Sequence, residues 1–269
     1  MIYDCFSYWD EDLLLDLRLN ILDKIVDRFV IVEGDKTWQN NPKKLKFDVK
    51  KFQKFKDKII YIPVTDLPDG EDPYLRENHQ RNSISKGIKD ANEDDIILIS
   101  DLDEIPCPKA IKNFDHKMRY ATFKQKHFYY KFNLQSKSYP YWYGSRVCIK
   151  KYLKSPQWLR DLKFKKRPFW RLDKFRLNNI ISDGGWHFCN LKTPEDLLYK
   201  YKNLCETNDP IHFKERIDPK YLQIDEIKKK VISGEDIIGR KDNFEKIELD
   251  YSFPEYLIKN IENYSDWII

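Results

Sequence analysis

Three acidic side chains stand together in the segment Asp101-Leu102-Asp103-Glu104, directly after the apolar run 96–100. In an extended chain, residues two positions apart point to the same side, so Asp101 and Asp103 can face one ligand while Leu102 turns to the core. Paired carboxylates suit Mg²⁺ or Mn²⁺ held jointly with substrate phosphates. A cation there would neutralise charge on a phosphate leaving group. The alternative is that these acids only cap the next helix.

A second cluster, DGGWHF at 183–188, is predicted to be a loop. Its two glycines allow positive φ or a close backbone approach to a ligand. Trp186 offers a stacking face for a sugar ring or a base, and His187 is able to ligate the cation or donate a hydrogen bond. Asp183 is a candidate general base. The alternative is an ordinary β-turn, with Trp186 and Phe188 in the core and His187 satisfied by the backbone.

The first hundred residues must supply the elements that position these groups. The predicted strands are 1–8, 28–33, 59–64 and 96–100, and the predicted helices are 10–25, 48–56 and 74–90. Continuous apolar strands joined by helices indicate a parallel sheet with both faces covered. Ligands of such sheets bind beyond the carboxyl ends of the strands. Segments 33–38 and 101–104 are therefore expected on the same rim of the sheet.

The chain after residue 115 is aromatic and prone to β-structure. Antiparallel or irregular strands are predicted within 120–132 and 139–149, whereas 151–180 is ambiguous. A helix is predicted after the cap Thr193 and Pro194, and another from 218 to its end at Gly234. A sugar platform or, alternatively, core packing is expected from four aromatic side chains: Tyr141, Trp142, Tyr143 and Trp186.

Composition limits the class of protein. The chain has 269 residues, of which 41% are hydrophobic and 15% aromatic, and this argues for a folded core rather than disorder. It lacks the run of about 18 apolar residues that a membrane helix needs. The N-terminus shows no secretory signal, and the five cysteines are widely spaced without a CxxC pair. We therefore expect free thiols, a cytoplasmic location and no CxxC-type zinc site.

Charge is unevenly distributed around a net value of +5. Residues 66–104 carry twelve acidic and four basic side chains, whereas residues 109–175 carry nineteen basic and three acidic ones. A basic stretch rich in tyrosine and tryptophan suits an anionic ligand such as a nucleotide phosphate or nucleic acid. The alternative is a solvated lysine-rich surface. No nucleic-acid recognition motif accompanies the basic stretch, and the acidic segment would repel a phosphate backbone unless it held a cation.

Three motifs occur in a characteristic order: DKIVDRFVIVEGDKT at 23–37, IILISDLDEIP at 96–106 and GGWHF at 184–188. Together, across roughly residues 1–240, they resemble glycosyltransferase family 17. The resemblance implies a GT-A-like fold, a UDP-sugar donor with N-acetylglucosamine as the expected sugar, Mn²⁺ or Mg²⁺ as cofactor, and inversion at the anomeric carbon. A glycan or glycoconjugate hydroxyl would be the acceptor.

The resemblance also implies roles for particular residues. Asp101 and Asp103 match the metal-nucleotide motif, and Glu33 and Thr37 match the turn after the second strand. Glu77, Arg81 and Asn82 resemble a helix that faces the nucleotide. The expected donor-binding residues are thus Glu33, Thr37, Arg81, Asn82, Asp101, Gly184, Gly185 and Trp186. The expected metal ligands are Asp101, Asp103 and His187, and the candidate bases are Asp183 and Glu104.

We therefore expect one α/β domain over 1–269, with a mostly parallel central sheet flanked by helices and an aromatic, basic, β-rich second half. Within it, 1–106 would form the nucleotide-binding half, 107–240 the acceptor-side half and 241–269 a C-terminal extension. The expected activity is metal-dependent, inverting glycosyl transfer from a UDP-sugar to a glycan hydroxyl. The alternatives are a metal-dependent sugar-nucleotide phosphohydrolase that uses the same carboxylates and a basic nucleic-acid-binding protein.

Overall fold

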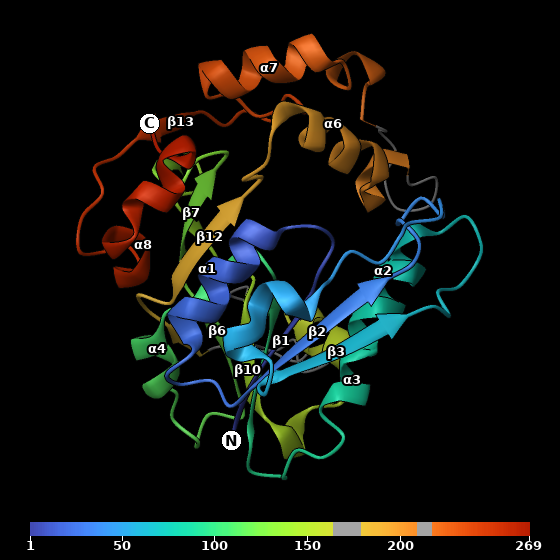
Figure 1. Cartoon of the computed structure of the whole chain (residues 1–269), viewed down its shortest axis with the longest axis vertical. Helices are drawn as coiled ribbons and strands as arrows, with labels where there is room; N and C mark the ends of the chain where they lie inside the picture. Colours follow the sequence, from blue (N-terminus) through green and yellow to red (C-terminus); the bar gives the residue numbers. More distant parts are fainter. Residues whose placement is uncertain (164–178, 209–216) are drawn as a thin grey trace, which may run out of the picture.

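A seven-stranded sheet lies at the centre of the computed structural model, which describes residues 1–163, 179–208 and 217–269 (Figure 1). In spatial order its strands are β11 (Ile180–Ile181), β6 (Tyr120–Phe123), β10 (Arg146–Ile149), β4 (Ile96–Asp101), β1 (Ile2–Ser7), β2 (Arg28–Gly34) and β3 (Ile59–Val64). The pairs β4–β1, β1–β2 and β2–β3 are parallel, and β10 is antiparallel to both of its neighbours. The first four strands along the chain lie close to their expected bounds.

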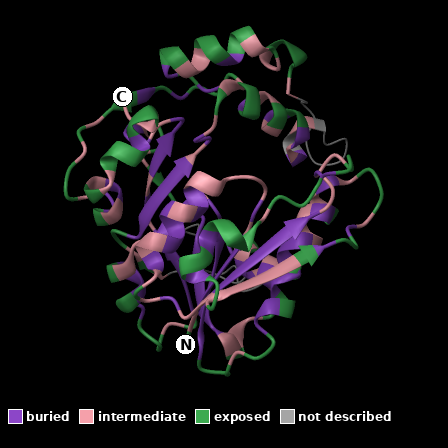
Figure 2. Cartoon of the chain, viewed as in Figure 1, coloured by how far each residue is buried: buried purple, intermediate pink, exposed green. Residues whose placement is uncertain are grey.

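Helices cover both faces of this sheet because its strands are apolar on both sides. On one face, Phe29 and Ile31 of β2 pack in a cluster with α1 (Asp12–Leu22) and the 3₁₀ segment η1 (Val49–Phe55). On the other face, Val30 and Val32 pack with α3 (Ile84–Gly87) and α5 (Pro156–Asp161). Figure 2 shows the resulting buried centre. The segment expected as one helix over 74–90 is divided into α2 (Pro73–Asn82) and α3.

A second sheet is formed by shorter strands from the later part of the chain. Its order is β13 (Phe244–Lys246), β8 (Leu134–Ser136), β7 (Gln125–Tyr129), β12 (Gly185–Cys189) and β5 (Glu104–Pro106), with β9 (Tyr141–Trp142) paired to β7. Since β5 follows β4 after only two residues, the segment between them joins the two sheets. The last segment of the chain supplies β13 to this sheet and Leu257 and Tyr264 to the main core.

The prediction of a loop over 183–188 is wrong, because most of that segment forms β12. This strand runs parallel to β7 and antiparallel to β5. Trp186 and Phe188 are buried in the main core, two residues apart. The segment therefore follows the two-residue period of a strand, and the pair of glycines marks only the turn that enters it.

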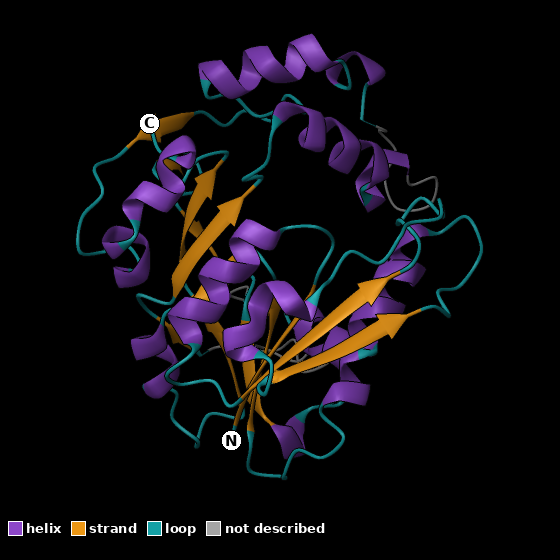
Figure 3. Cartoon of the chain, viewed as in Figure 1, coloured by secondary structure: helices purple, strands orange, loops and turns teal. Residues whose placement is uncertain are grey.

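The remaining helices and 3₁₀ turns are distributed around both sheets (Figure 3). They are α4 (Pro108–Lys112), α6 (Pro194–Asn203), α7 (Ile224–Ser233) and α8 (Glu255–Lys259), with 3₁₀ turns η2 (Lys150–Tyr152), η3 (Cys205–Asn208), η4 (Pro219–Tyr221) and η5 (Ile261–Trp267). Two expected helix signals are confirmed. Thr193 Oγ1 accepts a hydrogen bond from the Asp196 amide at 3.2 Å, and Gly234 ends α7 with φ of 67°. Helices α6 and α7 pack together through Leu197 and Ile227.

The described residues contain neither a membrane-spanning helix nor a disulfide bond. None of their helices is both long and apolar enough to cross a membrane. All five cysteines, which lie within the described ranges, are free, as expected from their spacing.

Gly185→Ala is expected to destabilise the fold by at least about 2 kcal/mol, because strained backbone alone costs about 1–3 kcal/mol. Gly185 has φ of +123°, and an added Cβ would lie 2.2 Å from the Ile105 carbonyl oxygen. Gly70 is a matched control, since its φ is +120° but nothing lies within 4 Å of an added Cβ. Urea unfolding of both variants measures the difference. Equal stabilities would contradict the close packing of β12 against β5.

Candidate functional site

The segment 101–104, here called the acidic turn, lies where β4 of the first sheet leads into β5 of the second. Asp101 and Asp103 line the same cavity, which has a volume of about 330 Å³. Leu102 packs in the main core, as the two-residue spacing predicts. Ser7, at the carboxyl end of β1, pairs in register with Asp101 and also lines the cavity. The two carboxylates thus share one cavity at the carboxyl ends of parallel strands, which is where such sheets bind ligands.

A buried arginine fixes the backbone of the acidic turn. Arg18 and Asp4 are fully buried, and the guanidinium donates to both Asp4 carboxylate oxygens at 2.7 and 2.6 Å. Its Nη1 donates to the carbonyl oxygens of residues 101, 102 and 104 at 3.1, 3.0 and 2.9 Å, and its Nη2 donates to Ser100 Oγ at 2.6 Å. We call this arrangement the Arg18 brace. It donates to three carbonyl oxygens of the turn at once, so it helps to hold the turn in one conformation.

Asp101 lies between two arginines. Its Oδ1 accepts from Arg81 Nη2 at 3.2 Å, and its Oδ2 accepts from Arg160 Nη2 at 2.6 Å. Burial opposes ionisation of this carboxyl, but Arg160 and then Arg81 outweigh burial and hold the pKa of Asp101 well below its usual range. The Asp101 side chain is nevertheless 41% exposed. It is therefore a charged carboxylate that is oriented by the protein and still open to the cavity.

Glu104 is held more tightly. Arg160 donates to both of its oxygens at 2.7 and 2.8 Å, and Trp142 Nε1 donates to Oε1 at 2.5 Å. The Asp101 amide donates to Oε2 at 3.1 Å, and Glu104 is 1% exposed. Both carboxylate oxygens of Glu104 are thus already engaged by protein donors, which fix the side chain in place. Its geometry suits positioning of Arg160 and Trp142 rather than the base role expected from the sequence.

Asp103 faces two stacked imidazoles. His187 Nε2 lies 3.5 Å from Asp103 Oδ1, and the rings of His187 and His127 are parallel with centroids 4.7 Å apart. Burial disfavours the charged form of His187, but the Asp103 carboxylate outweighs burial and raises the pKa of His187 to about 10. Burial and then repulsion from His187 lower the pKa of His127 to about 3. The two rings are thus in unlike states, one charged beside Asp103 and the other neutral.

The cavity wall is rich in aromatic side chains. Trp9, Trp38 and Trp142 line it, with the indoles of Trp9 and Trp38 5.9 Å apart in an edge-to-face arrangement. Basic groups on the wall besides Arg81 include Lys200 and Arg240. Aromatic faces beside cations and carboxylates suit a polar ligand that carries rings and phosphates.

Glu33 and Thr37 lie near the rim but do not line the cavity. Glu33 is fully buried, and its carboxylate accepts four hydrogen bonds. Two come from side chains, Lys43 Nζ at 2.5 Å and the Tyr61 hydroxyl at 3.0 Å. The other two come from the backbone amides of residue 46 at 2.8 Å and residue 47 at 3.0 Å. Thr37 Oγ1 accepts from the Asn41 amide at 3.2 Å. Both side chains therefore order the loop after β2, and Trp38 is the residue of that loop that reaches the cavity.

Arg81 lines the cavity, but five other predicted site residues lie away from it. Asn82 is exposed and accepts from the Gln157 amide at 3.0 Å. Trp186 is a core residue whose Nε1 donates to the Ser252 carbonyl at 2.9 Å, so a stacking role is wrong. The other three occupy the turn at the far end of β12 from Cys189, with Asp183 exposed and its two glycines packed against neighbouring backbone: Asp183, Gly184 and Gly185.

The donor set of the acidic turn fits a hard divalent cation. The Asp103 side chain is 19% exposed, and Asp101 is open to the same cavity. Each carboxylate offers about four lone-pair sites, and the contacts of Asp101 with Arg81 and Arg160 use only two. Oxygen donors of this type suit Mg²⁺ or Mn²⁺.

Sequence reasoning missed several residues that shape this site. Arg160 lies in the basic segment that was ambiguous, and nothing local shows that it meets the acidic turn. Asp4 had a signal, since it is the one charged residue of strand β1, and Arg18 had one because it lies among the buried leucines of α1. A lone charge in a strand or on a helix face that must be buried indicates a partner inside the core.

The sheet and its acidic cavity define an α/β protein with a cavity at the carboxyl ends of parallel strands, the place where such sheets bind ligands. A sequence model of glycosyltransferase family 17 matches residues 1–266, and the chain belongs to this family of glycosyltransferases. It is 26% identical over 216 residues to the beta-1,4-mannosyl-glycoprotein 4-beta-N-acetylglucosaminyltransferase of Homo sapiens, which covers 70% of this chain and 40% of that protein. The enzymes of the same name from Rattus norvegicus and Mus musculus are 25% identical over the same share of this chain. The chain thus spans about two fifths of the length of these relatives.

The Arg18 brace predicts an unusual double-mutant result. Asp4→Leu and Arg18→Met are each expected to lower the free energy of unfolding by about 3–5 kcal/mol, because each strands a buried charge. The double variant removes both charges but also removes the Arg18 donor from the carbonyls of residues 101, 102 and 104, of which the last keeps its bond from Ser145 Oγ. It is therefore expected to stay at least about 2 kcal/mol below the wild type in urea unfolding. A double variant within about 1 kcal/mol of the wild type would show that the ion pair, and not the brace, matters.

Proposed function

We propose that this chain transfers N-acetylglucosamine from UDP-N-acetylglucosamine to a glycan hydroxyl, with inversion at the anomeric carbon, in a GT-A-like fold. The observation that carries the proposal is the pair Asp101 and Asp103, which open into one cavity at the carboxyl ends of the parallel strands. Membership of family 17 supports glycosyl transfer, and the names of the relatives support the choice of sugar.

On the donor side, Asp103 and Asp101 are the proposed ligands of Mn²⁺ or Mg²⁺. A bound cation supplies charge neutralisation for the diphosphate leaving group. Asp101 is already compensated by Arg81 and Arg160, so Asp103 has more negative charge to offer. His187, which the sequence placed on the same cation, is proposed to orient Asp103 through Nε2. Arg81 and Lys200 add positive charge to the cavity wall for the phosphates.

Neither carboxylate proposed as the general base keeps that role in our account. Asp183 is exposed and lies outside the cavity lining. Glu104 lines the cavity, but Arg160, Trp142 and the Asp101 amide occupy its oxygens. We therefore propose Glu104 as a positioning residue that fixes the indole of Trp142 and the guanidinium of Arg160.

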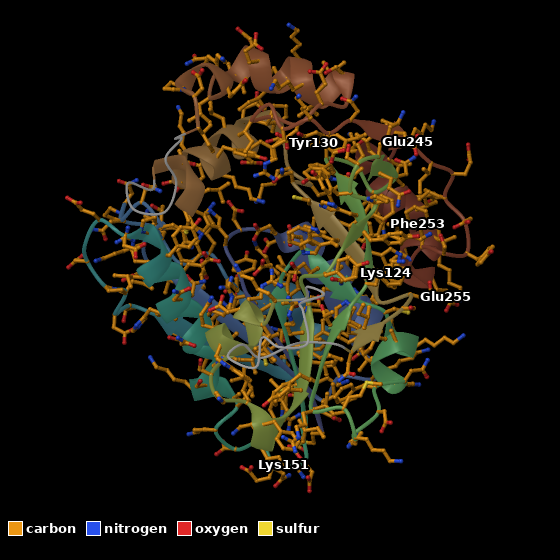
Figure 4. The ribbon with its side chains drawn as sticks, turned by 180° about the vertical axis from the view of Figure 1, so that it is seen from behind. Lys124, Tyr130, Lys151, Glu245, Phe253 and Glu255 are labelled. Carbon is orange, nitrogen blue, oxygen red and sulfur yellow. The ribbon has the colours of Figure 1, made fainter. Side chains whose placement is uncertain are left out.

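On the acceptor side, we propose that β9 forms a platform for a sugar ring. Tyr141 and Trp142 are 44% and 38% exposed, and Trp142 also lines the cavity. Lys124, labelled in Figure 4, places its ammonium 3.9 Å from the ring centre of Tyr141. Exposed aromatic faces beside a donor cavity suit carbohydrate, which packs its C–H surface on aromatic rings.

The burial of two arginines weakens the alternative that the chain is a nucleic-acid-binding protein. Arg146 and Arg160, two of the bases in the positive stretch, are largely buried and bound to protein groups. These two arginines are therefore not free to contact a phosphate backbone.

Asp103→Asn tests the donor site. It is expected to lower UDP-sugar turnover in Mn²⁺ by at least about a hundredfold, as loss of a transition-state charge stabiliser does. Thermal unfolding should stay near that of the wild type, because the Asp103 backbone keeps its bond to Phe188. Asp94→Asn, which changes a carboxylate that is 81% exposed before β4, is the matched control. Full activity of Asp103→Asn without a divalent cation would contradict the proposed metal site. UDP release by the wild-type chain at a rate that does not depend on any acceptor would favour the alternative function, a sugar-nucleotide phosphohydrolase.

Tyr141→Ala tests the acceptor platform. With a β-mannosyl glycoside as acceptor, the acceptor KM is expected to rise about three- to tenfold, the range of one aromatic contact, while the donor KM stays unchanged. Tyr251→Ala removes an aromatic ring that is 98% exposed and serves as the control. An unchanged acceptor KM would remove β9 from the acceptor site.

A further inference from the structure

Three side chains with nitrogen and sulfur donors meet beside the acidic turn. The ligand atoms of His127, His187 and Cys189 all lie within 4.8 Å of one another. None of the three was expected to act with the others, and their chemistry differs from that of the carboxylates. This cluster is independent of the proposed glycosyl transfer.

The second sheet brings the three side chains to one face. His187 of β12 pairs in parallel register with His127 of β7, and Cys189 lies two residues further along β12. Residues in register on neighbouring strands, and residues two apart on one strand, point to the same face. All three residues line the cavity, so the cluster opens into it.

Both imidazoles present a buried nitrogen to the cluster without a hydrogen-bond partner among the described residues. His127 Nδ1 lies 3.1 Å from the Tyr139 carbonyl oxygen, and an acceptor at that distance requires the hydrogen to be on Nδ1. His127 Nε2 is then a bare lone pair, and it is unpartnered. His187 has its Nε2 toward Asp103 and its Nδ1 unpartnered. His127 and His187 are 3% and 6% exposed, and buried polar atoms are rarely left without a partner.

Two imidazole nitrogens and one thiolate form the donor set of a borderline metal. Zn²⁺ prefers nitrogen and sulfur ligands at about 2.0–2.3 Å in a tetrahedron, whereas Mg²⁺ takes oxygen. Tetrahedral ligands at those lengths are roughly 3.3–3.8 Å apart. The present spread of up to 4.8 Å therefore closes by about an ångström through side-chain rotation.

We propose that His127 Nε2, His187 Nδ1 and Cys189 Sγ bind a borderline transition-metal ion such as Zn²⁺, with the fourth position facing the cavity. Binding releases the proton of His187 Nδ1 and the proton of the Cys189 thiol to solvent, because the metal takes neutral imidazole and thiolate. The site is separate from the oxygen site of Asp101 and Asp103. Two neighbouring groups complete its outer shell. The Tyr139 carbonyl holds the ring of His127, and Asp103 faces the far nitrogen of His187. A histidine whose second nitrogen meets a carbonyl or carboxylate is the usual form of a metal-bound histidine.

A Co²⁺ titration of the full, reduced and chelator-treated chain tests the site. In a large excess of Mg²⁺, which fills the oxygen site, we expect one bound Co²⁺ per chain, a thiolate-to-cobalt charge-transfer absorption, and displacement of that Co²⁺ by equimolar Zn²⁺ but not by the Mg²⁺ present. Cys189→Ser should abolish the charge-transfer absorption, and His127→Gln should weaken Co²⁺ binding at least about tenfold. Cys107→Ser changes a partly buried thiol that does not line the cavity and should leave the absorption intact.

Asp103→Asn separates this site from the proposed donor site. It should retain the charge-transfer absorption, since Asp103 is not a ligand of the soft metal. The proposal is overturned if the wild-type chain shows no such absorption, if the absorption survives in Cys189→Ser, or if Mg²⁺ displaces Co²⁺ as readily as Zn²⁺ does. None of these outcomes depends on UDP-sugar binding or turnover.

Discussion

The buried ion pair between Arg18 and Asp4 is the interaction on which the site depends. Placing two charges in a core is costly unless they are paired and their remaining hydrogen-bonding groups are satisfied. Here the guanidinium meets that condition by bonding Asp4, Ser100 and three carbonyls of the acidic turn. The same bonds that make burial of Arg18 tolerable therefore fix the only two residues between β4 and β5. One arginine on α1 therefore helps to fix the acidic turn, which is one of the points where the two sheets join.

The fixed turn sets up an ordered arrangement of charges around the cavity. Asp101 and Glu104 share Arg160, and Arg81 completes the neutralisation of Asp101. Among the ion pairs of the described residues, Asp103 takes part only in the one with the imidazole of His187. Such groups are held in place before any ligand arrives, so little reorganisation is needed on binding. In our proposed function this asymmetry makes Asp103 the main anionic ligand and Asp101 a carboxylate aligned by its arginines.

The sequence was most informative where local pattern and tertiary role agree. The apolar strands β1 to β4 and the spacing of Asp101 and Asp103 predicted both the strands and the shared direction of the two carboxylates. The GGWHF segment misled because Gly184 and Gly185 are typical of a loop, whereas the flanking strands β5 and β7 make the residues after them a strand. Arg160 was not predictable, because its contact with Asp101 joins positions far apart in the chain. Glu33 was predicted to bind a ligand, but its buried carboxylate is filled by the loop that follows it.

Calorimetric titration of the chain with UDP-N-acetylglucosamine, with and without Mn²⁺, tests the central claim most directly. It measures donor binding without requiring the acceptor. Our account predicts saturable one-to-one binding in Mn²⁺ and a loss of at least about tenfold in affinity when the cation is removed by chelation. Equal affinity in the presence and absence of a divalent cation would contradict it.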